Sequence, residues 1–100
     1  MVRFINCFEV PEGREDDFMR VFAEVNAYMT AQPGYVSHRL HKSVSPEAKY
    51  RFINDVEWES PEHWRAAHNP EFMAKASQPE WSFVTSTPAL YDIVDERTQS

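Results

Sequence analysis

The side chains able to do chemistry in this sequence gather between residues 50 and 70. Alternate residues of the strand predicted here form one face, on which Asn54 stands among large apolar side chains and Trp58 ends the run. A serine–proline pair then starts a helix that carries Trp64 and His68 one turn apart, and an asparagine–proline pair at 69–70 starts a second short helix. An amide, two indoles and an imidazole around an apolar hollow are groups that can bind and orient a small molecule. Plain core packing is also compatible with this pattern.

The amide of Asn54 has two interpretations. A buried amide needs hydrogen-bond partners, so it either bonds a loop backbone or is offered to a ligand oxygen. Asn6 lies on the corresponding face of the first predicted strand, between Phe4 and Phe8. Because the first and third strands of the predicted sheet are central neighbours, two asparagines among aromatic rings favour the ligand interpretation.

Histidine supplies the candidate proton acceptors. His68 is the best of them at neutral pH if it faces the hollow, with His38 second, although a lone histidine on a short helix commonly lies at the surface or caps the helix. Trp81, in a loop predicted to be irregular, is expected to be a lid or a dimer contact. We predict Asn54, Trp58 and His68 as catalytic residues. The predicted substrate-binding residues are Asn6, Phe4, Phe22, Phe52, Trp64, Phe72 and Trp81.

Sequence motifs for cofactors and metals are missing. The chain has only 2 glycines and no phosphate-binding loop, and it lacks HExxH, CxxC and EF-hand patterns. His38 and His41 are three residues apart in a strand and should point to opposite faces, and His63 and His68 are five apart on a helix. We therefore predict no metal site and no cofactor.

The composition describes one domain with apolar surface beyond its core, which we expect to form a ligand cavity and a subunit interface. The chain has 100 residues, enough for a single core, and an aromatic share of 14% that exceeds what a small two-layer core needs. The net charge of −6 argues against nucleic acid and anionic membranes as partners. The single Cys7 excludes an internal disulfide framework and suits a reducing cytoplasm, and neither a signal peptide nor a membrane span is predicted.

The hydrophobic periodicity predicts the order β-α-β-β-α-β. This is an α+β, ferredoxin-like fold, with a four-stranded antiparallel sheet that carries its helices on one face. We assign residues 1–96 to one domain and residues 97–100 to a polar tail. The predicted strands are 2–10, 35–43, 50–58 and 88–94, the predicted helices are 14–31, 61–68 and 70–77, and 78–87 is a loop.

The other face of the predicted sheet is partly apolar. It carries Ile5, Cys7 and Ile53, with Leu40 or Ile93 as further candidates. An uncovered antiparallel sheet normally has a polar outer face, so we predict a homodimer whose two sheets close into a dimeric α/β barrel. Positively charged residues such as Arg39 and Arg51 are expected to be solvated or to lie at the interface.

Five segments resemble one known family. The runs PGYVSHRLHKS, RFINDVEWES and PEHWRAAHNPEF, with the opening FEVPEGREDDF and the late TPALYDIV, are similar to the antibiotic biosynthesis monooxygenase family over roughly residues 2–95. The resemblance implies a ferredoxin-like dimeric α/β barrel. It also implies a cofactor-independent oxygenase for aromatic polyketides, in which a phenol or anthrone loses a proton, reacts with O2 to give a peroxide, and loses water to leave a quinone.

The resemblance also suggests residue roles and alternatives. It puts the family's pocket asparagine and tryptophan on Asn54 and Trp58, while Trp64 stands where the family has a pocket tyrosine. A sister branch degrades haem with an asparagine, a tryptophan and a histidine ligand; Asn6 and Trp64 match, but 72–77 contains no histidine, so only His68 could substitute. The alternatives to an oxygenase are a non-oxidative polyketide cyclase and a protein that binds haem or a hydrophobic metabolite.

Overall fold

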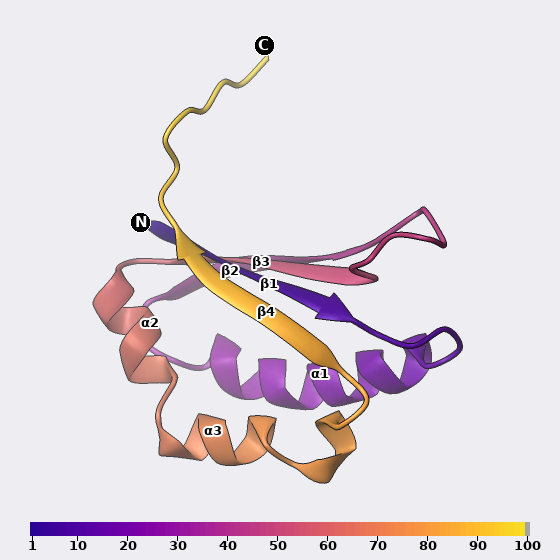
Figure 1. Ribbon diagram of the computed structural model, residues 1–100. Helices are drawn as coiled ribbons and strands as arrows, with labels where there is room; N and C mark the ends of the chain where they lie inside the picture. The colour runs from indigo at the N-terminus through magenta and orange to yellow at the C-terminus, as the bar shows by residue number, and fades with distance from the viewer. Residues whose placement is uncertain (100) are drawn as a thin grey trace.

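The computed structural model describes residues 1–99 as a four-stranded sheet with its helices on one side (Figure 1). Neighbouring strands are antiparallel in the order β2-β3-β1-β4, so β1 and β3 are central and adjacent, as predicted. This is the ferredoxin-like α+β fold. The elements are β1 (Val2–Glu9), α1 (Glu15–Thr30), β2 (Tyr35–Lys42), β3 (Phe52–Trp58), α2 (Pro61–Ala67), α3 (Pro70–Ala76), the 3-10 helix η1 (Pro79–Trp81) and β4 (Thr85–Tyr91).

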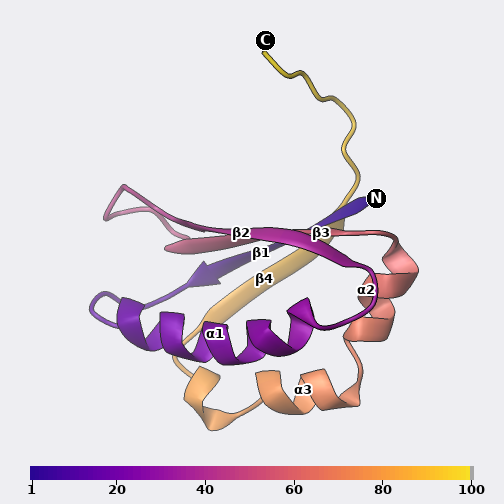
Figure 2. The same cartoon turned by 180° about the vertical axis from the view of Figure 1, so that it is seen from behind.

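The face of the sheet that meets the helices is built from alternate residues of β1 and β3. Each inward residue of one strand stands opposite an inward residue of the other, for example Phe4 opposite Val56 and Asn6 opposite Asn54. The view from behind shows α1 running across this same face, with α2 and α3 beside it (Figure 2). Phe18 of α1 is completely buried, and burial of such a ring stabilises the fold by about 1.5–3 kcal/mol.

The two short helices begin at side-chain caps, as the sequence predicts. Ser60 Oγ accepts a hydrogen bond from the His63 backbone N–H (3.1 Å) at the start of α2. Asn69 Oδ1 accepts one from the Phe72 N–H (2.9 Å) at the start of α3. Each cap is followed by a proline at the first helical position, where the missing N–H costs nothing. The caps therefore fix where the chain turns under the sheet.

A glycine is required in the turn between α1 and β2. Gly34 has φ +88°, and a Cβ placed on it would lie 2.3 Å from the His63 side chain. Its carbonyl also accepts a hydrogen bond from the Glu59 N–H (2.8 Å). Only glycine combines this backbone conformation with so close a neighbour. This contact joins the start of β2 to the corner between β3 and α2.

The C-terminal strand differs from the prediction. It covers Thr85–Tyr91 rather than 88–94, and the predicted loop 78–87 contains η1 and the first residues of this strand. The prediction treated Pro88 as the first strand residue, whereas it lies mid-strand opposite Asn6. A proline is tolerated there because β4 is an edge strand, where a missing N–H removes no ladder bond. The third strand also starts at Phe52 rather than at residue 50.

The outer face of the sheet is less apolar than predicted. Ile5, Cys7 and Ile53 lie on it, partly exposed, but Leu40 stands opposite Asn54 and therefore faces the helices. Ile93 lies beyond β4, where the chain leaves the sheet toward its C-terminus (Figure 1). Of the predicted tail 97–100, residue 100 lies outside the described residues. No helix within residues 1–99 is long and apolar enough to cross a membrane.

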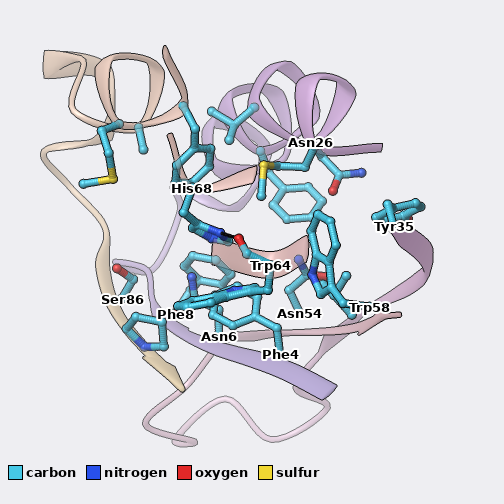
Figure 3. A pocket seen from close by; sticks show the side chains of 18 of the residues that line it. Phe4, Asn6, Phe8, Asn26, Tyr35, Asn54, Trp58, Trp64, His68 and Ser86 are labelled. Atoms are coloured by element: carbon cyan, nitrogen blue, oxygen red, sulfur yellow. Dashed lines mark hydrogen bonds between the residues drawn. The ribbon is translucent and has the colours of Figure 1, made fainter. Parts of the chain in front are cut away.

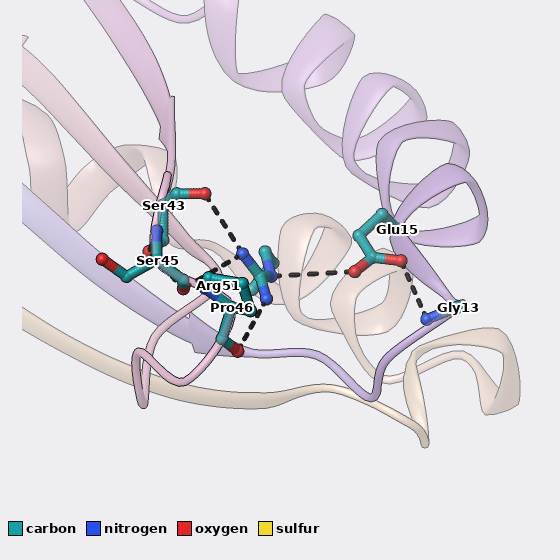
Figure 4. Close-up of polar contacts among 6 residues, drawn as sticks. All are labelled: Gly13, Glu15, Ser43, Ser45, Pro46 and Arg51. Carbon is teal, nitrogen blue, oxygen red and sulfur yellow. Dashed lines mark hydrogen bonds and ion pairs between the residues drawn. The ribbon is translucent and has the colours of Figure 1, made fainter.

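Arg51, expected to be solvated or to lie at an interface, is largely buried by contacts within its own chain. Its guanidinium donates hydrogen bonds to the carbonyls of Ser43 (3.1 Å) and Pro46 (3.0 Å) in the β2–β3 loop (Figure 4). Its Nε lies 3.7 Å from Oε2 of Glu15, and the other carboxylate oxygen of Glu15, Oε1, accepts a hydrogen bond from the Gly13 N–H (2.9 Å). Arg51 therefore ties the long hairpin loop to the start of α1.

Candidate active site

A cavity of about 310 Å³ lies between the inner face of the sheet and the helices (Figure 3). Small-molecule pockets range from about 300 to 1,000 Å³, so this one suits a compact ligand. All the predicted site residues except Phe52 line it. The predicted residues in its wall are Phe4, Asn6, Phe22, Asn54, Trp58, Trp64, His68, Phe72 and Trp81.

Phe52 is a core residue and does not reach the cavity. It is 2% exposed and its ring stacks on Phe18 with centroids 4.4 Å apart. It stands opposite Phe8 at the far end of β3 from Trp58, inside a second cluster of aromatic rings. Alternation puts it on the inner face, as predicted, but α1 covers it there. Trp81 of η1 packs against the same cluster, with its ring centroid 6.1 Å from that of Phe18, and it also lines the cavity.

The two asparagines form an opposed pair on the central strands. Asn6 and Asn54 are register partners, so their side chains leave the sheet side by side toward the cavity (Figure 3). Asn54 is 7% exposed. The side-chain Oδ1 of each is buried and has no hydrogen-bond partner in the protein. A buried oxygen left in this state costs about 1–3 kcal/mol, so neither amide oxygen contributes a stabilising bond to the fold.

Three indole N–H groups around the cavity are also buried without a hydrogen-bond partner. Nε1 of Trp58, Trp64 and Trp81 is buried without an acceptor in the protein. Buried tryptophan N–H groups usually find a partner. The cavity thus combines aromatic walls with two unpartnered acceptors and three unpartnered donors. These groups can bind a flat molecule that carries both hydroxyl and carbonyl oxygens.

His68 lies at the C-terminal end of α2, among three aromatic rings. Its ring centroid is 4.4 Å from that of Trp64, 4.7 Å from Phe72 and 5.4 Å from Phe4. Its Nδ1 lies 2.7 Å from the Trp64 carbonyl oxygen. A carbonyl only accepts, so Nδ1 carries a hydrogen and Nε2 of the neutral ring keeps its lone pair.

Burial fixes the charge state of His68. Desolvation lowers the pKa of its imidazole below the usual value, and the hydrogen bond to the Trp64 carbonyl opposes this only in part. The ring is therefore neutral at pH 7. A neutral imidazole with a defined basic nitrogen can act as a general base.

Other histidines do not assemble a metal site. His41 is exposed on the outer face, and His38 faces inward, so these two point to opposite faces as predicted. His63 Nδ1 bonds Ser60 Oγ (2.7 Å) at the α2 cap. Among residues 1–99, no group of three His, Cys, Asp or Glu side chains could hold a metal ion.

The cavity wall also contains polar residues that the sequence reasoning missed. Asn26 lies on α1 between Phe22 and Met29, at the helical spacing that marks the inner face, so its position was readable from the sequence. Ser86 was missed because β4 was predicted too late in the chain. Tyr35 lines the cavity from the start of β2 because of a bulge, which alternation does not predict.

Comparison with known proteins agrees with the fold. Residues 1–78 match the family model described as antibiotic biosynthesis monooxygenase. Protein YczJ of Bacillus subtilis (strain 168) is 30% identical, over 95% of this chain and 99% of YczJ.

Two solved structures show the range of activities among similar proteins. SnoaB of Streptomyces nogalater, a cofactor-independent oxygenase, is 27% identical with a TM-score of 0.80, over 98% of this chain and 97% of SnoaB. The heme-degrader MhuD of Mycobacterium tuberculosis, solved with two hemes in its active site, is 25% identical with a TM-score of 0.74, over 98% of this chain and 100% of MhuD.

Proposed function

The chain belongs to the antibiotic biosynthesis monooxygenase family, and from that premise we propose that it is a cofactor-independent monooxygenase. The proposed substrate is an aromatic polyketide-type anthrone or phenol, which it oxidises with O2 in secondary metabolism. The proposed catalytic residues are Asn54, Trp58 and His68.

The observation that carries this proposal is the set of unpartnered polar atoms in an aromatic cavity. The Oδ1 atoms of Asn6 and Asn54 need donors, and the indole N–H groups of Trp58, Trp64 and Trp81 need acceptors. A hydroxylated anthrone offers phenolic hydroxyls to the first group and carbonyl or enolate oxygens to the second. Its flat rings match the walls, and about 310 Å³ suits about two or three fused rings.

The chemistry follows from these groups in sequence. His68 Nε2 takes a proton from the substrate carbon, and the charge spreads to the oxygen of the resulting enolate. The amide N–H of Asn54 and the indole N–H of Trp58 donate to that oxygen, which stabilises the anion in a site with little water. The anion then reduces O2, forms a carbon–oxygen bond to give a peroxide, and loses water to leave a ketone.

Oxygen uptake tests this function. Protein treated with a chelator and freed of flavin should consume O2 when given dithranol (1,8-dihydroxy-9-anthrone), above the rate without protein. Asn54→Ala should lose most of this activity and His41→Gln, a change on the outer face, should not. An unchanged rate in Asn54→Ala would overturn the role of that residue. Conversion of the substrate under strict anaerobiosis would replace the oxygenase by an enzyme that does not use O2.

Haem binding is the second candidate function, favoured by one observation. A neutral His68 with a free Nε2 lone pair is also the form in which histidine binds a metal. A Soret shift on adding haemin that is lost in His68→Ala would support this function. The same spectrum in the wild type and His68→Ala would exclude His68 as the ligand.

We further propose a homodimer in the cytoplasm, formed through the outer face of the sheet. Ile5, Cys7 and Ile53 are half-buried there, beside an ion pair between Arg3 and Asp55 (2.9 Å). Light scattering coupled to size exclusion should give twice the 11.7 kDa chain mass. Replacing Ile53 by aspartate should shift that mass to one chain, and an unchanged dimer would place the interface elsewhere.

A further inference from the structure

A bulge at the start of β2 turns two reactive side chains to the same face. Tyr35 stands opposite Trp58, and Ser37 stands opposite the next residue of β3, so Val36 is an extra residue in β2. Residues three apart in a regular strand point to opposite faces. With one residue inserted, Tyr35 and His38 both face the helices. Bulges commonly occur next to active sites, where they redirect a side chain.

The two side chains are joined in a hydrogen-bonded chain with a third. The Tyr35 hydroxyl bonds His38 Nδ1, and His38 Nε2 lies 3.3 Å from Nδ2 of Asn26 on α1. Tyr35 and Asn26 line the cavity. His38 lies on an edge strand and is partly exposed, so its ring connects the cavity wall to solvent. Figure 3 shows Tyr35 and His68 on opposite sides of the cavity.

The proton positions follow from what each partner can donate. The amide nitrogen of Asn26 only donates, so it leaves Nε2 of a neutral His38 as the acceptor and the ring hydrogen on Nδ1. Nδ1–H then donates to the Tyr35 oxygen, and the Tyr35 O–H is free to donate to a bound molecule. Burial raises the pKa of the Tyr35 phenol, so it remains a proton donor at neutral pH.

The charges near this chain lie on its outer side. His38 borders a polar groove whose charged members are Arg3, Arg39, Glu57, Asp95 and Glu96. On the inner side its neighbours are uncharged: the Phe22 ring at 6.2 Å, Asn26 and Tyr35. The charged groups with which His38 could exchange a proton therefore lie on its solvent side.

We propose that Tyr35 is the proton donor of this site and that His38 returns a proton to it from solvent. This rests on the proposed oxygenase function, in which His68 removes protons on one side of the cavity and Tyr35 donates protons on the other. The substrate CH2 carbon loses both of its protons to His68, one before and one after O2 binds, and His68 releases the first to solvent before it takes the second. Tyr35 supplies two protons to oxygen, one to the peroxide and one to the hydroxide that leaves when the O–O bond breaks. The carbon gives up four electrons, and O2 is reduced to the ketone oxygen and one water.

A spectroscopic titration tests the pair without any turnover. The probe is alizarin, a dihydroxyanthraquinone whose visible absorption shifts when a hydroxyl ionises. The Tyr35 hydroxyl should stabilise the bound anion, so Tyr35→Phe should raise the pKa of bound alizarin by about 1, equivalent to about 1.4 kcal/mol. His41→Gln on the outer face is the matched control and should leave it unchanged. Tyr35→Phe keeps the ring that packs edge-on against Trp58 at 5.7 Å, and its melting temperature checks the fold.

Nitrogen NMR of His38 supplies the readout for the relay itself. Binding of alizarin should shift the His38 side-chain 15N resonances in the wild type and leave them unchanged in Tyr35→Phe. The proposed roles of Tyr35 and His38 are refuted if the pKa of bound alizarin is the same in Tyr35→Phe as in the wild type, or if the His38 15N resonances do not shift when alizarin binds. If these shifts occur but dithranol is not oxidised, the oxygenase function fails and the pair stands. If dithranol is oxidised and the shifts are absent, the pair alone fails.

Discussion

Replacing Asn54 by leucine should stabilise the protein and abolish its oxygenase activity together. The side chain is 7% exposed and its Oδ1 has no partner in the protein. Leucine has a similar size and removes the desolvation penalty of about 1–3 kcal/mol. In a domain of this size, each kcal/mol raises the melting temperature by about 4–8 °C. Urea unfolding of the wild type and variant measures the free-energy difference, and oxygen uptake with dithranol measures the loss of activity.

Asn69 provides the matched control for this prediction. Its Oδ1 accepts hydrogen bonds from the Phe72 N–H (2.9 Å) and from the Tyr28 hydroxyl (3.0 Å). Asn69→Leu removes this cap and should lower the free energy of unfolding by about 1–2 kcal/mol. The reasoning is refuted if Asn54→Leu destabilises the protein as Asn69→Leu does, since Asn54 would then make a structural bond. It is also refuted if Asn54→Leu retains full activity.

Other predictions concern the base, the turn and the hairpin loop. His68→Gln should lower the oxidation rate about 10²–10⁴-fold, and on the acid side the wild-type rate should fall when His68 becomes protonated, below its ordinary pKa of about 6.5. Because the pKa of His68 is lowered in the folded state, the unfolded state binds more protons below about pH 6.5, and the free energy of unfolding should fall as the pH is lowered there. Urea unfolding should show a smaller fall in His68→Phe. Gly34→Ala should lower the free energy of unfolding by about 2–4 kcal/mol, from its positive φ and the clash with His63, and a loss under about 0.5 would contradict the structure. Arg51→Met should destabilise by about 1–2 kcal/mol and speed proteolysis of the β2–β3 loop, whereas the exposed Arg39→Met should stay within about 0.5.

The sequence predicted the fold and most of the cavity because both depend on alternation. Asn6 and Asn54 fall on the inner face of their strands simply by counting residues, and the caps at Ser60 and Asn69 mark the helix starts. The count cannot tell which inward residues are covered, so Phe52 was predicted in the pocket although Phe18 stacks on it.

Features that interrupt alternation were beyond reach of the pattern. The bulge before His38 changes the face of Tyr35, and nothing in the local sequence marks it. A proline in a strand pattern predicts a strand boundary. Pro88 lies within β4 instead because β4 is an edge strand, and the local sequence does not show the order of the strands in the sheet. The role of Arg51 depends on loop carbonyls and on Glu15, which lies 36 residues earlier in the sequence. These contacts exist only once the chain has folded.

The central claim is that this cavity transfers one oxygen atom from O2 to an aromatic substrate. Mass spectrometry of the product formed from dithranol under ¹⁸O2 in ordinary water measures this most directly. The account predicts an anthraquinone that carries one ¹⁸O atom at the new carbonyl, formed by chelator-treated, flavin-free protein and largely lost in Asn54→Ala. A product whose new oxygen comes from water, or one that forms equally without O2, would contradict it.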